Sequence, residues 1–394
     1  TACKMRAEQQ LRTFMRVFEK FPADKPLAKF LPEFFKRNKQ MGSNDRRSAS
    51  RLLYNYFRLG RAVADKSIEQ RLFLAEFLCT SVDNPFLHHF RPDLNEKIYL
   101  SPDEKISYAC LNEGLDMNEV FPFTEHLSDG IDKGAFLRSF FVQPDLFIRM
   151  HPKAVSWVLK TLEESNVDFS MIAEHTVALP NGTNLNALFP DNSFPVKPYE
   201  VQDLSSQKTS VYFKPNRYEH WWDACAASGG KSLLLFSEQP DIKLLVSDIR
   251  ESVLDNLDER FIAAGLRTYQ KKVIDLTKNA DPEIHHYEFD GIILDAPCSG
   301  SGTWGRTPEM ISQFEEYKIR GFQNLQMTIA ANVIKYLKQG KPLIYITCSV
   351  FREENEEIVN WLQKNHGMQL EGYELIKGYE NKADTMFVAR LIKL

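Results

Sequence analysis

The sequence has no run of about 18 or more apolar residues, the length that a helix needs to cross a bilayer. Its first residues, Thr1 to Arg6, lead into charged residues and not into the apolar core of a signal peptide. No internal repeat, low-complexity segment or long flexible linker is present. These absences argue against a membrane-spanning protein and a repeat array, so we expect a soluble, cytoplasmic protein.

Closely spaced cysteines are also absent. The six cysteines are scattered, and none has the Cys-x-x-Cys spacing of a zinc site or the dense pattern of a disulfide framework. We therefore expect no metal site, and we expect thiols that stay reduced and are available for chemistry.

The chain lacks an overall excess of positive charge, because 49 Lys and Arg against 53 Asp and Glu give a formal net charge of −4. The distribution is uneven. Through Leu72 there are 17 basic and 7 acidic residues, a balance of +10, so the remainder carries −4 − 10 = −14. Such asymmetry favours one segment that faces polyphosphate, although a charged helical surface exposed only to solvent gives the same count.

The N-terminal part of the chain reads as helical. At 394 residues with 43% hydrophobic residues, the chain is long enough for two or three globular domains. From about Gln9 to Cys110, apolar residues recur at helical spacing, which predicts an all-helical, basic domain over residues 1–135. The segment Ser43 to Arg47 predicts a helix start, with short polar side chains available to cap backbone N–H groups.

Two further regions follow. Residues 136–200 show shorter mixed elements, with a helix at Ala154–Ser165 and a loop at Pro180–Gly182, and we assign them to a small α/β subdomain. Residues 201–394 alternate near-continuous apolar strands with helices, which predicts an α/β domain whose parallel sheet is covered on both faces. The expected strands include Leu244–Ser247, Gly291–Leu294 and Leu343–Ile346, and the expected helices include Ser252–Ala264 and Phe322–Leu337.

A nucleotide-binding turn is predicted after the first of these strands. The run Trp221–Ser232 passes from a strand through small residues into a helix that begins near Ser232. Small residues allow close backbone approach, and a helix N-terminus presents free N–H groups to a ligand. The candidate cofactor-binding residues of this turn are Cys225, Ala226, Ala227, Ser228, Gly229, Gly230 and Lys231.

Two other motifs resemble nucleotide sites but fail on context. Gly230-Lys231-Ser232 resembles the end of a phosphate-binding P-loop, yet Cys225 stands where that motif needs glycine. The run Gly300–Gly305 fits G-x-G-x-x-G, but no helix opens within it and a loop continues through Pro308. We therefore disfavour an NTPase and a dinucleotide-binding protein.

Three acidic residues stand at successive expected strand ends, namely Asp248, Asp275 and Asp295. An acid after the second strand usually accepts the ribose hydroxyls of an adenosine moiety, which makes Asp248 the predicted ribose ligand. Asp275 is placed to receive the adenine amino group. Each acid taken singly is equally compatible with a helix cap.

Two cysteines follow strand ends on the same side of the expected sheet. They lie in the segments Leu294–Gly302 and Tyr345–Ser349, as Cys298 and Cys348. A single cysteine is more often a small buried hydrophobe. With Cys225, however, half of the chain's cysteines surround one expected pocket.

These motifs together resemble those of the Sun/Fmu family of RNA (cytosine-5) methyltransferases. The resemblance runs from about Glu200 to Leu394 and includes the segment Val201–Gln207. Its motifs are Asp223-x-Cys-Ala-Ala-x-Gly-Gly-Lys231, Asp295-Ala-Pro-Cys298-Ser-Gly-x-Gly, Thr347-Cys348-Ser349 and Glu353-Glu354-Asn355-Glu356. The family implies a Rossmann-like domain that uses S-adenosylmethionine, preceded by a subdomain similar to an RNA-recognition module.

The resemblance also implies the roles of the catalytic residues. Cytosine carbon 5 is too weak a nucleophile to take a methyl group directly, so a thiolate must first add to carbon 6. The family assigns this thiolate to Cys348 and assigns its later release to Cys298. Asp295 is expected to hydrogen-bond N3 and N4 of the cytosine, and Lys231 is a candidate partner of that carboxylate or of the base.

Three positions depart from the family pattern. Ser228 replaces the usual proline, Val253 stands where arginine is common, and His151 replaces a frequent asparagine after Ile148-Arg149-Met150. None removes a thiol or a carboxylate that the chemistry needs, so they bear on cofactor geometry and RNA contact.

Several alternatives stay open at this point. The layout resembles family members that act on small-subunit ribosomal RNA, while tRNA is an alternative substrate. A DNA cytosine-5 methyltransferase uses the Pro-Cys cysteine as nucleophile, and Thr347-Cys348-Ser349 favours RNA instead. A ribosome-assembly factor with little turnover is the alternative from another class. We expect a monomer whose target cytosine lies in a loop or is flipped out.

Overall fold

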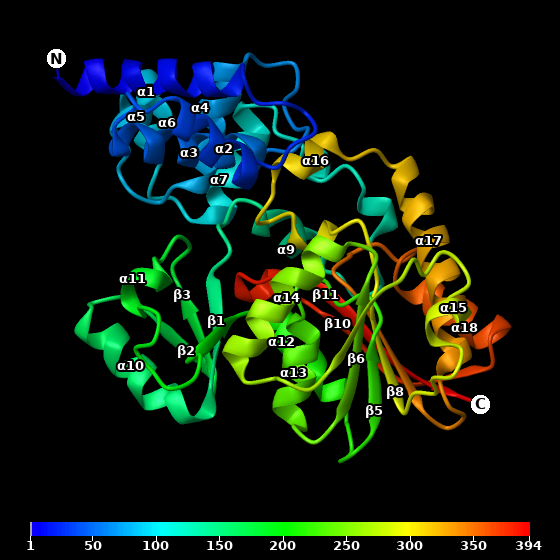
Figure 1. Ribbon diagram of the computed structural model, residues 1–394. Coiled ribbons are helices and arrows are strands. Elements are labelled where there is room, and N and C mark those ends of the chain that lie inside the picture. Colours follow the sequence, from blue (N-terminus) through cyan, green and yellow to red (C-terminus); the bar gives the residue numbers. More distant parts are fainter. Residues whose placement is uncertain (1) are drawn as a thin grey trace. The chain divides into compact units, whose positions relative to one another are not determined.

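The computed structural model describes residues 2–394, which form two compact units (Figure 1). The first unit contains the chain up to Glu125 together with Asp132–Gln143 and Thr303–Glu316. The second contains His126–Ile131, Pro144–Gly302 and Tyr317–Leu394. Each unit therefore combines segments that are distant in the sequence.

The first unit is helical, as the apolar spacing predicts. Its helix α3 begins at Ser43 as expected, but the capping prediction is wrong, because the N-cap is Gly42 and no side chain bonds the first turn. Phe14, Leu52 and Leu53 are among its buried residues. Its helices are α1 (Ala2–Phe18), α2 (Leu27–Arg37), α3 (Ser43–Phe57), α4 (Ile68–Cys79), α5 (Pro85–Phe90), α6 (Pro92–Asn95), α7 (Pro102–Asn112), α8 (Met117–Val120), α9 (Lys133–Ser139) and α16 (Glu309–Gln313).

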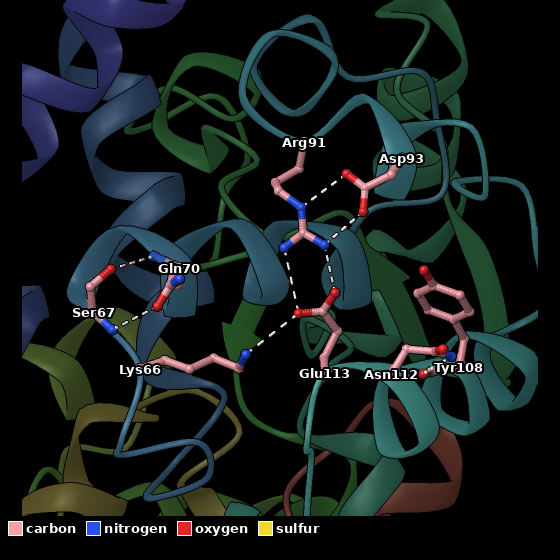
Figure 2. Close-up of polar contacts among 8 residues, drawn as sticks. All are labelled: Lys66, Ser67, Gln70, Arg91, Asp93, Tyr108, Asn112 and Glu113. Carbon is pink, nitrogen blue, oxygen red and sulfur yellow. Dashed lines mark hydrogen bonds and ion pairs between the residues drawn. The ribbon is translucent and has the colours of Figure 1, made fainter.

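Polar contacts join the ends of several of these helices (Figure 2). Arg91 binds Asp93 and Glu113 at 2.7 and 2.5 Å, and Lys66 lies 3.7 Å from Glu113. The side chain of Ser67 caps α4 in a capping box with Gln70. This network links the start of α4 to the short helices α5 and α6 and to the end of α7.

The second unit begins with a small antiparallel sheet of order β2-β3-β1-β4. The predicted helix over residues 154–165 is present as α10 (Val155–Glu164), which packs Val158 and Leu162 against Ile148 and Met150 of β1. The elements of this subdomain are β1 (Leu146–Met150), α10, β2 (Ser170–Ala173), β3 (Thr176–Leu179), α11 (Leu185–Leu188) and β4 (Tyr199–Val201).

The rest of the second unit is built on a seven-stranded sheet of order β10-β11-β9-β8-β5-β6-β7. Strands β5 to β9 are parallel, whereas β11 and β10 are antiparallel additions that we did not predict. The strands are β5 (His220–Asp223), β6 (Lys243–Asp248), β7 (Gln270–Val273), β8 (Gly291–Asp295), β9 (Pro342–Thr347), β10 (Met368–Ile376) and β11 (Met386–Lys393). The order in which strands are added to the sheet reverses between β5 and β8, and ligands bind at such a point in sheets of this kind.

Helices cover both faces of this sheet, as Figure 1 shows. Successive residues of one strand point to opposite faces, so Trp222 lies in one apolar cluster and Trp221 in the other. Helices α17 and α18 pack on the first cluster, and α13 and α14 on the second. The helices are α12 (Leu204–Lys208), α13 (Gly230–Glu238), α14 (Glu251–Ala264), α15 (Asp281–Ile284), α17 (Tyr317–Val333) and α18 (Glu356–Asn365). The predicted Rossmann-like α/β fold is confirmed.

Three boundaries differ from those read in the sequence. Helix α13 begins at Gly230 rather than near Ser232, and α17 begins at Tyr317 rather than at Phe322. Strand β7 ends at Val273, so Asp275 lies two residues beyond the sheet. Within residues 2–394, no helix has the length and hydropathy of a membrane span.

Candidate active site

Four parallel strands bring the predicted site residues to one edge of the large sheet. Asp223, Asp248 and Asp295 are the last residues of β5, β6 and β8, and Cys348 directly follows β9. In register, Asp223 is paired with Ile293 of β8, and Asp295 with Ile346 of β9. The carboxylates and Cys348 therefore gather at the carboxyl ends of neighbouring strands.

The turn between β5 and α13 is shaped for a ligand. Ala227 and Gly229 have φ values of 47° and 84°, and a Cβ on Gly229 would lie 2.3 Å from the Phe261 ring. The N–H of Ala226 donates to the Ser247 carbonyl and that of Ala227 to Asp248, at 2.9 and 3.0 Å. No side chain caps α13, so the N–H groups of its first turn remain for a ligand.

Two other residues of this turn have defined surroundings. Burial, followed by the charge of Asp223, raises the pKa of Cys225, so this cysteine stays a neutral thiol. Ser228, which replaces the family's proline, accepts a hydrogen bond at 3.0 Å from Arg260. Arg260 also pairs with Glu200 at 2.9 Å, so the serine ties the turn to α14 and to β4.

Asp223 is fully buried beneath the turn. Its Oδ2 accepts a hydrogen bond from Ser232 at 2.7 Å, while Oδ1 has no partner among the described residues. Burial raises the pKa of Asp223 to about 7, with Asp295 and Asp248 adding to the effect. This carboxyl is therefore substantially protonated near neutral pH.

Asp248 and Asp275 have different environments. Asp248 is buried and receives hydrogen bonds from the Arg250 backbone and side chain, both at 3.0 Å. Burial alone would raise the pKa of Asp248, but these bonds and that from Ala227 outweigh it, and the pKa is lowered. Asp275 instead accepts hydrogen bonds from the Thr277 hydroxyl and N–H, at 2.6 and 3.0 Å, in a local turn. Their ribose and adenine roles stay predictions.

Lys231 joins the turn to Asp295. Its Nζ lies 2.9 Å from Asp295 Oδ2 and 2.9 Å from the Ser206 hydroxyl, and its side chain is only 8% exposed. Gln202 donates to both Ser206 and the Gly230 carbonyl, each at 3.3 Å. The expected partnership between Lys231 and Asp295 is present, and Ser206 and Gln202 hold the lysine in place.

The sulfur atoms of Cys298 and Cys348 lie 3.3 Å apart. The hydrogen bond to Cys348, together with burial, raises the pKa of Cys298 well above that of a free thiol. Cys298 therefore keeps its proton and can donate it in a hydrogen bond to Cys348.

A single buried carboxylate positions both cysteine loops. Glu354 accepts hydrogen bonds from the Ser299 N–H at 2.8 Å and the Ser299 hydroxyl at 2.6 Å, and also from the Ser349 hydroxyl. Ser299 directly follows Cys298, and Ser349 directly follows Cys348. The amide of Gln326 donates to the same carboxylate at 2.9 Å. Glu354 thus binds the residue next to each thiol.

Backbone contacts complete this arrangement. The N–H of Gly302 donates to the Cys348 carbonyl at 2.8 Å, and the Gly302 carbonyl accepts from Thr385 at 2.9 Å. A Cβ at Gly302 would lie 1.9 Å from the Thr385 carbonyl oxygen, so no other residue fits. Asn355 donates to the Ser349 carbonyl at 2.9 Å. The two loops therefore form one rigid body.

Glu354, Asn355, Gln202 and Ser206 were not predicted from the sequence to have a role. All four stand in motifs that carried the family resemblance, but their partners are distant in the chain. Glu354 is separated from Ser299 by 55 residues, and Lys231 from Ser206 by 25. The sequence did show that an acid, two amides and a hydroxyl stand in these motifs without a chemical role, and this could have marked them as candidates. Within residues 2–394, no group of three His, Cys, Asp or Glu side chains converges as metal ligands.

The raised pKa of Asp223 predicts a pH-dependent stability. The folded state binds this proton up to about pH 7, whereas an unfolded aspartate releases it near 4, so the stabilisation present at low pH is lost as pH rises between those values. Asp223→Asn cannot ionise. Its free energy of unfolding relative to the wild type, measured by chemical denaturation, should therefore rise from about pH 5 to about pH 7, by roughly 1.4 kcal/mol per pH unit at most. A difference that is constant over this range would contradict the raised pKa.

The Glu354 contacts predict that Glu354→Gln loosens both cysteine loops. An amide nitrogen would face the donors that now bind the carboxylate, which should cost about 1–3 kcal/mol of stability. We expect a lower melting temperature and slower diamide oxidation of Cys298 and Cys348 to a disulfide, measured by intact mass. Glu357→Gln, an exposed neighbour that binds Gln323, is the control and should behave as wild type. Wild-type values in Glu354→Gln would rule out the positioning role.

Comparison with known proteins agrees with this geometry. Residues 210–392 match the family model described as 16S rRNA methyltransferase RsmB/F. The chain is 32% identical over 207 residues to ribosomal RNA small subunit methyltransferase B of Salmonella arizonae, covering 49% of this chain and 46% of that protein. The corresponding Shewanella oneidensis protein is 31% identical over 205 residues, covering 49% and 47%. The chain thus spans about half the length of the curated relatives it matches.

Solved structures show the same fold. The crystal structure of PH0851 superposes with a TM-score of 0.71 at 22% identity, covering 100% of this chain and 99% of that one. The structure of NSun6 from Pyrococcus horikoshii with SFG gives 0.58 at 16% identity, covering 69% and 97%. The match to the family model, with the motifs around Asp295, Cys298 and Cys348, confirms the resemblance found in the sequence. Residues 210–392 of the chain thus match the RsmB/F, or Sun/Fmu-type, family of methyltransferases.

Proposed function

We propose that this protein transfers a methyl group from S-adenosylmethionine to carbon 5 of a cytosine in RNA, with Cys348 as the nucleophile. The observation that carries the proposal is the 3.3 Å contact between the sulfur atoms of Cys298 and Cys348. The two cysteines follow β8 and β9, and Asp295 is the last residue of β8. Two thiols serve a reaction in which one sulfur must bond to the base and later leave it.

The residues at the strand edge suit the proposed cofactor. The positive-φ turn at Ala227 and Gly229, the uncapped start of α13 and the Asp248 carboxylate match an adenosine-bearing ligand. We propose Asp248 for the ribose, Asp275 for the adenine, and the turn Cys225–Lys231 for the remaining polar groups. When bound, S-adenosylmethionine supplies an activated methyl group.

The chain's own residues account for activation of the cytosine. The Cys348 thiolate forms a bond to carbon 6, and the electron pair of the C5–C6 double bond makes carbon 5 nucleophilic. Asp295, as the acid, donates a hydrogen bond to N3 and accepts one from the N4 amino group, which stabilises the negative charge that builds up at N3, while Lys231 holds Asp295 in place at 2.9 Å. After methylation, the carbon 5 proton passes to a base, the double bond forms again, and the sulfur of Cys348 leaves.

Cys298 acts in this last step. Its pKa is raised, so its thiol is protonated when the Cys348 sulfur leaves the base as a thiolate. A hydrogen bond from Cys298 stabilises that charge at 3.3 Å. Without it, release is slower than addition, and the covalent adduct accumulates.

We further propose RNA of the small ribosomal subunit as the substrate and the cytoplasm as the compartment. The curated relatives are named as small-subunit ribosomal RNA methyltransferases. The first 72 residues carry a charge balance of +10, which suits binding of RNA phosphates. The six cysteines are free thiols, as is usual in a reducing compartment.

The cysteine roles predict opposite phenotypes for two variants. Cys348→Ala should lose methyl transfer to RNA from labelled S-adenosylmethionine, because no sulfur remains to activate carbon 6. Cys298→Ala should form a covalent protein–RNA adduct that survives denaturing electrophoresis. Cys110→Ala, which changes an exposed thiol, is the control and should methylate as wild type. Adduct in Cys348→Ala and none in Cys298→Ala would reverse the two roles.

The charge asymmetry predicts steep salt dependence of RNA binding. The logarithm of the RNA association constant should fall linearly with the logarithm of salt concentration, with a slope of roughly −0.7 to −0.9 per phosphate contact. Removing the exposed charges at the end of α2, in Lys36→Gln, Arg37→Gln and Lys39→Gln combined, should weaken binding and flatten the slope. The triple variant Lys160→Gln, Lys243→Gln and Lys364→Gln removes equal charge from the second unit as a control. RNA affinity that is insensitive to salt would exclude this role.

A further inference from the structure

A pocket lies within the second unit, and none of the predicted catalytic and cofactor residues lines it. It has a volume of about 450 Å³ and lies between the small subdomain and helices α13 and α14. Arg149, Lys153 and Lys197 form its cationic side, and Leu233, Phe236 and Pro240 form an apolar side. This size is within the range of pockets that hold a small organic ligand.

Arg149 is a half-buried cation with unused hydrogen-bonding capacity. Its Nε donates to Gln202 Oε1 at 3.1 Å, while its two terminal nitrogens make no hydrogen bond to any residue that the structure describes. Burial lowers the pKa of Arg149, which reflects the cost of removing the guanidinium from water. An anion in the pocket would offset this cost.

The neighbouring carboxylates Glu200 and Glu238 act on Arg149 through their charge, but neither makes a hydrogen bond to its terminal nitrogens within the described residues. Glu200 is already paired with Lys197 at 3.2 Å and with Arg260 at 2.9 Å. Glu238, which also acts on Arg149 through its charge, lies exposed near the end of α13. The four cations Arg149, Lys153, Lys197 and Arg260 therefore exceed the two carboxylates by two charges.

His151, one of the departures from the family pattern, also lines this pocket. Its Nδ1 accepts a hydrogen bond at 3.2 Å from the N–H of Lys153, so the ring proton of the neutral form is on Nε2. Burial, followed by the charges of Lys153 and Arg149, lowers the pKa of His151. At neutral pH the ring therefore offers a donor and a flat surface without further charge.

We propose that this pocket binds one nucleotide of the substrate RNA other than the target cytosine. Its phosphate lies against Arg149, Lys153 and Lys197, and its base packs on the ring of Phe236. A phosphate next to a planar base is the ligand that combines an anion with an apolar surface, and unpaired RNA presents such bases. The assignment rests on the proposed function, because that function makes RNA the substrate.

A chain of hydrogen bonds connects the pocket to Asp295, which is proposed to bind the target cytosine. Gln202 accepts a hydrogen bond from Arg149 and donates one at 3.3 Å to the Gly230 carbonyl. Through Ser206 it also connects to Lys231 and then to Asp295, with each bond 3.3 Å or shorter. The nucleotide in the pocket thus belongs to the stretch that flanks the methylated base.

The test measures binding of a labelled single-stranded RNA of about 12 nucleotides to full-length variants. The double variant Lys153→Gln, Lys197→Gln removes two of the three cations that contact the phosphate, so affinity should fall about threefold to tenfold and the salt slope should flatten by about 0.7. Arg149→Gln should weaken binding similarly, whereas Arg149→Lys keeps the charge and should be milder. The double variant Lys160→Gln, Lys243→Gln is the charge-matched control and should bind as wild type.

A second measurement locates the RNA. RNA that contains 4-thiouridine should cross-link under light to the peptide that contains Phe236, and the double variant Lys153→Gln, Lys197→Gln should lose this cross-link. Wild-type affinity and slope in that variant, or an equal loss in the control, would overturn the pocket assignment. Failure of the proposed function has a different signature, because Cys298→Ala would then form no covalent RNA adduct. An adduct with unchanged binding in the pocket variants would leave that function standing and the pocket assignment refuted.

Discussion

The candidate active site depends on one buried carboxylate. Burying a charged group without partners costs several kcal/mol, and burial raises the pKa of Glu354. The hydrogen bonds that Glu354 accepts from Ser299, Ser349 and Gln326 offset part of this cost. Two of these donors directly follow the two cysteines. The bonds that make the buried carboxylate tolerable therefore also fix the 3.3 Å separation of the sulfur atoms. Stability and the geometry of the thiols have the same origin.

The same edge of the sheet carries three carboxylates, which would repel one another if all were charged and unpaired. Each is neutralised differently. Asp248 pairs with Arg250, Asp295 pairs with Lys231, and Asp223 has a pKa raised to about 7 by burial. The two paired acids are those proposed to contact the ribose and the cytosine. Lys231 connects the cofactor turn to the proposed cytosine site, because it lies in the first turn of α13 and its side chain binds Asp295.

Much of this arrangement could be predicted from local sequence. The strand runs at Leu244, Gly291 and Leu343 and the small-residue turn before α13 are continuous patterns, so their positions were predicted to within a few residues. Because parallel strands have their carboxyl ends at the same edge of a sheet, these runs also placed Asp248, Asp295 and Cys348 at one edge. Asp275 was placed less well, because β7 ends two residues earlier.

The remainder depends on contacts between residues far apart in the chain. The partners of Glu354 and Lys231, and the nearness of Arg149 to the cofactor turn, follow from packing of separate segments and have no local pattern. The side-chain cap expected in Ser43–Arg47 is absent, because the N-cap residue of α3 is Gly42, which has no side chain. Strands β10 and β11 were missed; β10 still follows a helix, α18, but no α-helix separates it from β11, with which it pairs antiparallel.

The most direct test of the central claim is to identify the residue that bonds to the base. Wild-type protein would be incubated with S-adenosylmethionine and RNA that contains 5-fluorocytidine, whose fluorine cannot leave as the carbon 5 proton does. The covalent product would then be digested and sequenced by mass spectrometry. The account predicts a methylated nucleotide bound to the peptide that contains Cys348. A nucleotide bound to the peptide that contains Cys298, or the absence of any covalent product, would contradict it.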